Sequence, residues 1–474
     1  GKMMTILETD ICIIGGGSGG LSVAAGASQM GARVVLFERH KMGGDCLNYG
    51  CVPSKALLAA AKLAYHPPQA KAMGITTKAS VNMAAVKAHI DEVIASIAPH
   101  DSVERFTSLG VKVIEADARF IDHQTVAGGG YTVKAKFFVI STGSSPFVPP
   151  VDGLSTTPYY TNENIFTLDH VPEHLIIMGG GPIGIEMAQA WKRLGADVTL
   201  VEAASILSRD EPRLVEILHH HLEAEGINLI AGTAITHAEG TNGQITVTLK
   251  GQSTGSLNGS HLLVAVGRRP NLDGLDLDKA GITYDKAGIT TDNRLRTTNR
   301  RVFAIGDIAG RQQFTHIAGY HAGIVIRNML FRLPAKIDES HIPWVTFTDP
   351  EMAHVGLTTD MAKAAGYDPV QLITPLTEND RARAERRTEG MVIAVTTKKG
   401  RILGASILAP HAGELIGAWG VAIAARASIK TMASYIAPYP TYGEASKRAA
   451  GAFYTSKLFS PRLKRLVRFM LKWF

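Results

Sequence analysis

One pattern, an apolar run followed by a glycine turn and a second apolar run, occurs twice in this chain of 474 residues. The first copy joins the apolar run at 9–14 to GGGSGG and then to a second run at 33–38. The second copy joins 174–178 to GGGPIG and then to 197–202. An apolar strand that enters a GxGxxG turn and a helix is typical of a parallel strand–helix–strand unit. The duplication therefore predicts two α/β domains with parallel sheets.

The glycines of each copy have separate physical tasks. The first permits a tight turn, the second lets a pyrophosphate approach the backbone, and the third allows close packing of helix on strand. The following helix points unpaired N–H groups and its positive dipole end at the phosphates. These glycines are Gly15, Gly17 and Gly20 in the first copy and Gly179, Gly181 and Gly184 in the second. Two copies in one context are much more specific than one, and they predict two Rossmann-like dinucleotide sites.

An acidic residue follows each glycine turn at the same distance. Glu38 lies 18 residues after Gly20, and Glu202 lies 18 residues after Gly184. A carboxylate at the end of the second strand holds the hydroxyl pair of a ribose. In the second copy it would also repel a 2′-phosphate, which favours NADH over NADPH. Arg209 lies near enough in the sequence to keep NADPH open as an alternative.

The most specific stretch of the chain is GGDCLNYGCVPSK at 43–55, which holds two of the three cysteines. Four residues separate Cys46 from Cys51, and on a helix turn this spacing would bring the thiols within disulfide reach. In a reducing compartment such a pair is more often catalytic than structural. Two thiols are too few for structural zinc, so no resident metal is expected. Cys12 lies in an apolar run and is expected to be a buried small side chain.

Length and composition limit the class of protein. The chain is too long for one ordinary core, and about three domains are expected. Its 45% hydrophobic and 19% charged residues describe a soluble globular protein, and no apolar run is long enough to span a bilayer. The N-terminal residues show no secretory pattern, so the expected location is cytoplasmic. Basic residues are distributed over most of the chain, which argues against a nucleic-acid groove.

In these motifs the chain resembles the pyridine nucleotide–disulfide oxidoreductases, in the branch that contains dihydrolipoamide dehydrogenase, glutathione reductase and mercuric reductase. The resemblance extends from Asp10 to about Phe453. It implies a homodimer whose active site is shared across the interface. The implied domains are an FAD-binding domain at 3–150 and 276–342, an NAD(P)-binding domain at 151–275, and a C-terminal α+β dimerisation domain at 343–474.

The resemblance also assigns the site residues. It implies that FAD is bound by Gly15, Gly17, Gly20, Glu38, Gly44, Lys55, Ala118, Thr142, Gly143 and Asp307. It implies that NAD(H) is bound by Gly179, Gly181, Ile183, Gly184, Glu186, Glu202 and Gly267. Electrons would pass from nicotinamide through flavin to a Cys46–Cys51 disulfide, with Cys51 facing the flavin and Cys46 meeting the acceptor. Lys55 would lie against the flavin, paired with Glu186, and the helix start and Lys55 could lower the thiol pKa as thiolate chemistry requires.

Two positions depart from the family pattern. Asp45 stands where a threonine or similar neutral residue is common, and its charge should oppose ionisation of Cys46. The family motif HPTxxE reads YPTYGE at 439–444, so Tyr439 replaces the histidine that takes protons from thiols, while Glu444 keeps its place. An unperturbed phenol titrates near pH 10, against about 6.5 for imidazole. Tyr439 is therefore expected to be a poor proton acceptor at neutral pH.

The tyrosine bears on the acceptor. Mercuric reductase also carries tyrosine here, and reduction of a metal ion needs soft thiolates but no thiol base. The C-terminal cysteine pair of that branch is missing, since no cysteine follows Cys51 in this sequence. We expect a mercuric-reductase-like core whose acceptor is a disulfide or a thiol-bound metal ion. The alternatives are dihydrolipoamide dehydrogenase, a membrane-associated NADH diaphorase or quinone reductase, and a redox-sensing module that binds cofactors without turnover.

The C-terminal segment 457–474 has a composition of its own, with six basic residues and no acidic one. It is expected to form a basic amphipathic helix. From Pro461 onward the apolar residues that recur on one helical face are Leu463, Leu466, Val467, Met470, Leu471 and Phe474. Such a helix predicts either peripheral contact with an anionic membrane or packing of the apolar face on the protein or its partner subunit.

Overall fold

The computed structural model describes residues 4–311 and 315–474. The chain divides into two compact units, which are described separately below. Unit 1 comprises Gly1–Gly179, Ala190–Ala203 and Gly232–Ile337, and unit 2 comprises Gly180–Gln189, Ala204–Ala231 and Asp338–Phe474. The mixed α/β class expected from the duplicated pattern is confirmed.

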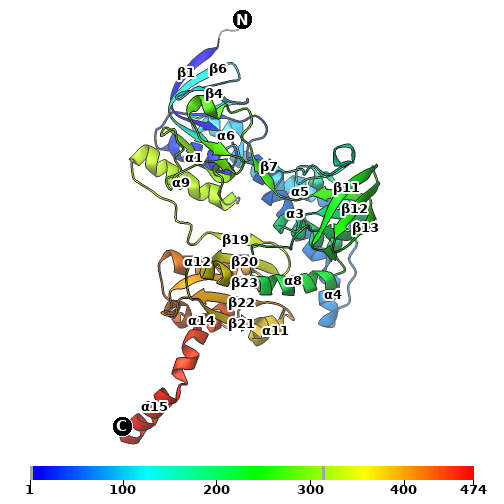
Figure 1. The fold of residues 1–474 in the computed structure, drawn as a ribbon, viewed down its shortest axis with the longest axis vertical. Helices are drawn as coiled ribbons and strands as arrows, with labels where there is room; N and C mark the ends of the chain where they lie inside the picture. The colour runs from blue at the N-terminus through cyan, green and yellow to red at the C-terminus, as the bar shows by residue number, and fades with distance from the viewer. Residues whose placement is uncertain (1–3, 312–314) are drawn as a thin grey trace. The chain divides into compact units, whose positions relative to one another are not determined.

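A mainly parallel sheet forms the first half of unit 1, with strands in the order β3-β2-β1-β6-β5-β4 and β18 added beside β6 (Figure 1). The central strand β1 pairs in parallel with β2 and β6, and β4–β5 forms an antiparallel ribbon. The strands are β1 (Thr5–Ile14), β2 (Val34–Phe37), β3 (Lys112–Ile114), β4 (Arg119–Asp122), β5 (Thr125–Gly128), β6 (Tyr131–Ile140) and β18 (Val302–Ala304). The strands predicted at 9–14 and 33–38 are therefore confirmed.

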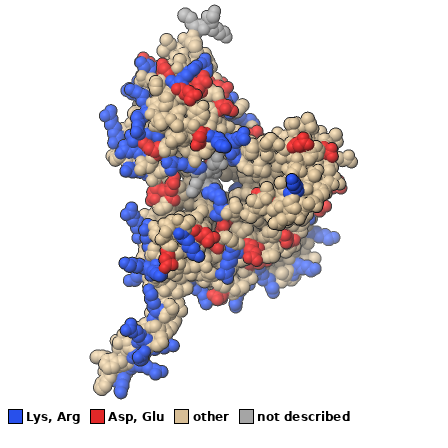
Figure 2. Space-filling model, viewed as in Figure 1, with Lys and Arg blue, Asp and Glu red and all other residues tan. Residues whose placement is uncertain are grey.

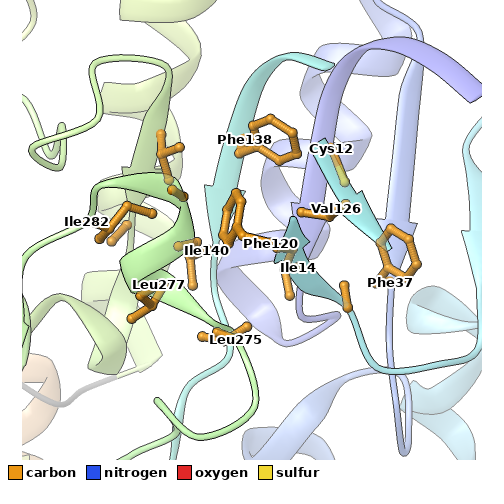
Figure 3. Close-up of a cluster of buried hydrophobic side chains, with 14 of the residues drawn as sticks. Cys12, Ile14, Phe37, Phe120, Val126, Phe138, Ile140, Leu275, Leu277 and Ile282 are labelled. Atoms are coloured by element: carbon orange, nitrogen blue, oxygen red, sulfur yellow. The ribbon is translucent and has the colours of Figure 1, made fainter. Parts of the chain in front are cut away.

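Strand β1 is apolar at successive positions because both faces of its sheet are buried. Ile11 and Ile13 belong to a core cluster with helices α1 (Ser18–Gln29) and α9 (Thr315–Phe331). Cys12 lies between them in the strand and faces the other side of the sheet. There it packs in a second core cluster, which contains the edge-to-face pair of Phe120 and Phe138 (Figure 3). Cys12 is fully buried, as predicted, and this burial raises the pKa of its thiol.

The second half of unit 1 repeats the parallel arrangement. Strand β8 (His174–Met178) lies between β9 (Asp197–Val201) and β14 (His261–Val264), which confirms the strands predicted at 174–178 and 197–202. Helix α7 (Pro182–Leu194) follows the second glycine turn, and its residues up to Gln189 belong to unit 2. An antiparallel sheet follows in the order β11 (Thr233–Thr241), β12 (Gln244–Gly251) and β13 (Gly255–Gly259), and β7 (Ser144–Pro146) pairs with β15 (Arg268–Pro270). The helices around the dithiol segment are α2 (Gly44–Asn48), α3 (Cys51–Ala64), α4 (His66–Ala72), α5 (Met83–Ile97) and α6 (Val103–Ser108).

Unit 2 is built on an antiparallel sheet in the order β19-β20-β23-β22-β21. One core cluster joins this sheet to four helices. Its Trp419 is fully buried and donates from Nε1 to Ser446 Oγ at 3.0 Å. The strands are β19 (Pro343–Thr346), β20 (Glu351–Gly356), β21 (Val370–Pro375), β22 (Met391–Thr396) and β23 (Ile402–Ala409). The helices are α8 (Pro212–Ala224), α10 (Thr359–Ala364), α11 (Asp380–Ala384), α12 (Ala412–Ala424), α13 (Ile429–Ser434), α14 (Gly443–Leu458) and α15 (Pro461–Trp473).

The C-terminal segment differs from the single helix expected over 457–474. Lys457 lies in the last turn of α14, and a new helix, α15, begins at Pro461. The break has a local cause, because Ser460 caps α15 by accepting the N–H of Leu463 at 3.3 Å. Proline at the first position of a helix loses no hydrogen bond there, whereas inside a continuous helix it would remove one.

A histidine in α8 links this helix to a loop of unit 2. His221 Nε2 lies 2.7 Å from Glu225 Oε2, and His221 Nδ1 contacts Glu389. Burial lowers the pKa of His221, but the two carboxylates outweigh burial and raise the pKa to about 9. The folded unit therefore binds a proton on His221 more tightly than the unfolded chain does.

This pairing predicts a pH-dependent loss of stability in H221Q. A raised folded-state pKa stabilises the protein fully below about pH 6.5, and this stabilisation is lost as the pH rises through 9. We expect H221Q to lower the free energy of unfolding by about 2 kcal/mol near pH 6 and by much less near pH 10. Urea unfolding at both pH values measures the difference. The control is H220Q, at a neighbouring side chain that is 73% exposed. A deficit of H221Q that is the same at both pH values would contradict the assignment.

Candidate active site

The first glycine turn lies between β1 and α1. It leaves open space at its second glycine, where a ligand could approach, but no space for a side chain at its first and third glycines. A Cβ atom at Gly15, whose φ is +109°, would lie 2.3 Å from Ser141 O, and one at Gly20 would lie 2.0 Å from Gly15 O. A Cβ at Gly17 would meet no atom within 4 Å. The turn thus has a tight first glycine, an open second one and a packed third one, and it fits a pyrophosphate at Gly17.

The carboxylate of Glu38 is fixed beside this turn. Glu38 follows β2, and its Oε2 accepts the N–H of Gly16 at 2.6 Å, while its Oε1 accepts the N–H of His40 at 2.9 Å. Two backbone donors hold the side chain at the carboxyl end of β2, next to the glycine loop. This is the place where a ribose hydroxyl pair is expected.

The dithiol segment starts directly on the same loop. Gly43 donates its N–H to Gly16 O at 2.9 Å. Gly44 has a φ of +61°, and a Cβ atom there would lie 2.9 Å from the Cα of Gly17. The backbone that leads into Cys46 therefore touches the backbone that would hold the pyrophosphate, and a side chain at position 44 would separate them.

The two cysteines lie on consecutive helices, so the single helix turn expected for them is wrong. Cys46 is half-buried in α2, whereas Cys51 is exposed and is the first residue of α3. The chain breaks between them at Gly50, whose φ of −120° and ψ of −118° are not helical. The positive end of the α3 dipole favours negative charge on Cys51. The disulfide between the two residues stays a prediction.

The charge of Asp45, beside Cys46, is balanced by an arginine. Arg268 Nη2 lies 3.1 Å from Asp45 Oδ1, and the Arg268 side chain is only 13% exposed. Asn162 also donates to Asp45 Oδ1, at 3.3 Å. Sequence reasoning missed Arg268 and Asn162. The expected opposition to Cys46 ionisation is therefore offset by a nearby cation.

Arg268 also connects the dithiol segment to Asp307. Its Nε donates to Ser144 Oγ at 2.8 Å, and Ser144 Oγ donates to Asp307 Oδ2 at 2.5 Å. Asp307 lies in the 3₁₀ turn Gly306–Ala309 that follows β18. Burial raises the pKa of Asp307, although the Ser144 bond and Arg268 act in the opposite direction. Buried polar groups of this kind suit hydrogen bonding to a bound polar chain.

Four further residues were predicted to bind FAD: Thr142, Gly143, Ala118 and Lys55. Thr142 and Gly143 lie between β6 and β7. Thr142 Oγ1 donates to Asn271 O at 3.0 Å, and Gly143 has a φ of +69°. Ala118 is buried in the same core cluster as Cys12, so only its backbone is available to a ligand. Lys55 Nζ donates to Ser54 Oγ at 3.3 Å in the first turns of α3.

The second glycine turn repeats the geometry of the first. Gly179 has a φ of +119°, and a Cβ there would lie 2.1 Å from Ala265 O, as Gly15 lies against Ser141. A Cβ at Gly181 would meet no atom within 4 Å. Gly267 has a φ of +129° after β14, and Glu202 directly follows β9. In α7, Ile183 is 43% exposed, whereas Gly184 and Glu186 are buried. The pairing of Lys55 with Glu186 stays a prediction.

Tyr439 in unit 2 is held by a residue that the sequence did not indicate. Its Oη donates to Asp380 Oδ2 at 2.7 Å, and its side chain is exposed. The hydrogen bond to Asp380 raises the pKa of Tyr439 above its ordinary value. Glu444 Oε1 instead accepts the N–H of Thr441 at 3.0 Å, so it holds the backbone of the motif. Asp380 lies 59 residues before Tyr439, and no spacing signal could have found it.

Two dinucleotide loops in one chain, with a dithiol segment packed on the first, define a flavoprotein disulfide oxidoreductase. Residues 9–322 match the family model of pyridine nucleotide-disulphide oxidoreductases, and residues 342–450 match the dimerisation domain of the same family. The chain belongs to this family, and its relatives are FAD-dependent enzymes. The dimerisation domain indicates a homodimer.

Named relatives span two activities. The chain is 34% identical over 450 residues to mercuric reductase from Lysinibacillus sphaericus, which covers 94% of this chain and 82% of the relative. It is also 34% identical over 457 residues to dihydrolipoyl dehydrogenase 2 from Haloarcula marismortui. This match covers 94% of this chain and 96% of the relative. Among solved structures, the Cu(II) complex of the HOCl-induced flavoprotein disulfide reductase RclA from Escherichia coli has a TM-score of 0.83 at 27% identity, with 92% of this chain and 98% of that chain covered. LpdA from Mycobacterium tuberculosis has a TM-score of 0.85 at 26% identity, with 94% of this chain and 99% of that chain covered.

The contact between Gly44 and Gly17 predicts a defect in flavin binding for G44A. The added Cβ would lie 2.9 Å from Gly17 Cα and would move the dithiol segment off the phosphate loop. We expect the ratio of flavin to protein after purification to fall several-fold, as measured by visible absorbance. The matched control is G31A, since Gly31 also has a positive φ, of +92°, but has open space around its Cβ position. Equal flavin content in the two variants would refute the packing argument.

The Asp45–Arg268 pair predicts a compensating double substitution. In a C51S background, R268Q leaves Asp45 unbalanced beside Cys46, and alkylation of Cys46 near pH 7 should slow by about 10-fold. The double variant D45N/R268Q removes both charges and should restore most of the rate. Iodoacetamide labelling followed by mass spectrometry measures the rate, because the buried Cys12 does not compete. If the double variant stays as slow as R268Q, charge balance is not the function of the pair.

Proposed function

We propose that this enzyme transfers two electrons from NADH to a disulfide or to a thiol-bound metal ion, with Cys46 and Cys51 as the redox-active pair. Bound FAD would supply the two-electron link between nicotinamide and the cysteine pair. The residues that would hold it are the first glycine loop, Glu38 and Asp307, and the open space at Gly17 supports this fit.

The cysteines carry the second half of the reaction. With a disulfide acceptor, the Cys46 thiolate attacks one acceptor sulfur and forms a mixed disulfide, and the other half of the acceptor leaves as a thiolate. Cys51 then attacks Cys46, which releases the second thiolate and regenerates the Cys46–Cys51 disulfide. With a metal acceptor, the two thiolates would bind the ion and its carrier thiolates would leave. The two electrons that NADH supplies would then reduce one mercuric ion to the metal, or two cupric ions to the cuprous state. In both cases Arg268 would offset the negative charge of Asp45 beside Cys46.

The observation that carries the choice of acceptor is the state of Tyr439. Oxidation of a dithiol releases two protons, and the family enzymes use a histidine base for them. Here the phenol donates to Asp380 at 2.7 Å, and this hydrogen bond raises the pKa of Tyr439 further from neutrality. The hydroxyl is suited to donate to, or to ligate, a bound group. This disfavours dihydrolipoamide oxidation, the second candidate, although dihydrolipoyl dehydrogenases are among the relatives.

The relatives support a metal acceptor. Mercuric reductases match along 94% of this chain, and RclA was solved as a Cu(II) complex. Soft thiolates suit the soft mercuric ion and the cuprous ion that forms when Cu(II) is reduced. We propose NADH as the electron donor because the carboxylate of Glu202 follows β9, where it would meet the ribose. The guanidinium of Arg209 lies over the Trp344 ring, 5.2 Å from its centroid, which does not favour recognition of a 2′-phosphate.

An acceptor panel tests this function. We expect NADH oxidation with mercuric or cupric thiolates or with glutathione disulfide to be faster than with quinones, and to be lost in C46S. Dihydrolipoamide oxidation near pH 7 should be slow, and Y439H should raise it at least ~10-fold because imidazole supplies the missing base. Its rate in Y439H should rise with pH through about 6.5. Fast dihydrolipoamide oxidation by the wild type would contradict the proposal, and quinone reduction that survives C46S would favour a diaphorase.

A further inference from the structure

Helix α15 lies beyond the family's dimerisation domain, whose match ends at residue 450. None of its residues is buried, and Figure 1 shows it extending away from the sheet of unit 2. Its exposed apolar side chains are large, with Leu471 at 80%, Trp473 at 65% and Phe474 at 100% exposure. The packing of this face on its own chain, one of the two expectations from the sequence, is therefore not seen in the part of unit 2 that is described.

The charge of the chain is concentrated at this helix. The segment 457–474 holds six basic residues and no acidic one, while the whole chain has a formal charge of +7. The rest of the chain is therefore close to neutral. In Figure 2 the C-terminal tail, at the lower left of the view, shows Lys and Arg side chains next to uncharged surface.

The basic residues and the apolar residues of α15 lie on different sides of the helix. Lys464, Arg468 and Lys472 recur every four residues and form a cationic stripe. The apolar residues of α15 cover the opposite side at the spacing of a single helical face. Phe469 and Trp473 lie at the border, with ring centroids 6.5 Å apart, and Lys472 Nζ lies 5.6 Å from the Trp473 ring. Aromatic rings at the border of an apolar face are typical of helices in a membrane interface.

From this arrangement we infer that α15 binds the surface of an anionic lipid bilayer and holds the enzyme there. Its apolar face would enter the acyl boundary, and the cationic stripe would meet the lipid phosphates. A second copy of the helix would cover the apolar face but offers the cationic stripe no anionic partner, because 457–474 contains no acidic residue. A nucleic acid would match the charge but would leave the apolar face in water. None of the described helices is long and apolar enough to cross a bilayer, so the contact is peripheral.

Vesicle sedimentation of the full-length, FAD-loaded protein tests this inference. We expect binding to vesicles of phosphatidylcholine mixed with phosphatidylglycerol, little binding to phosphatidylcholine alone, and weaker binding as salt rises. Deletion of 461–474 should abolish binding while the flavin absorbance is retained. Replacing the cations by glutamine in K464Q/R465Q/R468Q/K472Q should weaken binding at least ~10-fold. The matched control has the same change in net charge at exposed lysines outside the helix: K286Q/K363Q/K399Q/K430Q.

Three outcomes would overturn the inference. One is unchanged sedimentation after the deletion, and another is equal loss of binding in the tail and control quadruple variants. The third is a deletion that changes the oligomeric mass in analytical ultracentrifugation, which would assign the apolar face to contact between copies of the chain. None of these results depends on the electron acceptor, so the inference and the proposed function fail or stand separately.

Discussion

The close approach of backbone to backbone at the first glycine loop is the constraint on which the site of unit 1 depends. Gly15 lies against the end of β6, and Gly44 lies against Gly17, so neither contact tolerates a side chain. The same loop also holds Glu38 through the N–H of Gly16. One short turn therefore positions the phosphate site, the ribose carboxylate and the start of the dithiol segment together. Because interiors are close-packed, a small displacement of this turn would be transmitted to all three.

Charge balance is the second condition for thiol chemistry in this protein. A carboxylate beside Cys46 would disfavour the thiolate, which is the reactive form. The structure offsets it with Arg268, a largely buried cation that also donates to Ser144. Because Ser144 in turn donates to Asp307, the polar network reaches from the dithiol segment to the turn after β18. Arginine suits this position since it stays charged and its planar fork can donate in several directions at once.

Two features at the C-terminal end of the dimerisation domain bear on the activity, which family membership alone leaves open. The motif at 439–444 keeps the glutamate of the family but not the histidine, and the glutamate binds the backbone of the motif. The tyrosine is oriented by Asp380, whose negative charge makes the phenol harder to ionise. Beyond residue 450 the chain adds α14's last turns and α15, which the family match does not include. Relatives that share the core of this chain at about one-third identity carry two different names, so the core alone does not decide the acceptor.

The sequence by itself determined the duplicated strands, the glycine turns, the burial of Cys12 and the family, because these follow from patterns within a few tens of residues. Local pattern also predicted the amphipathic C-terminal helix, but it missed the break at Ser460 and the second break at Gly50, which depend on capping and backbone angles. Only the tertiary structure decided the partners of Asp45 and Tyr439. Arg268 is far from Asp45 along the chain, and Asp380 is 59 residues from Tyr439, so their meeting depends on the order of strands and loops in each unit. Neither the Asp45–Arg268 ion pair nor the Tyr439–Asp380 hydrogen bond leaves a periodic signal in the sequence, because packing alone brings the two partners together.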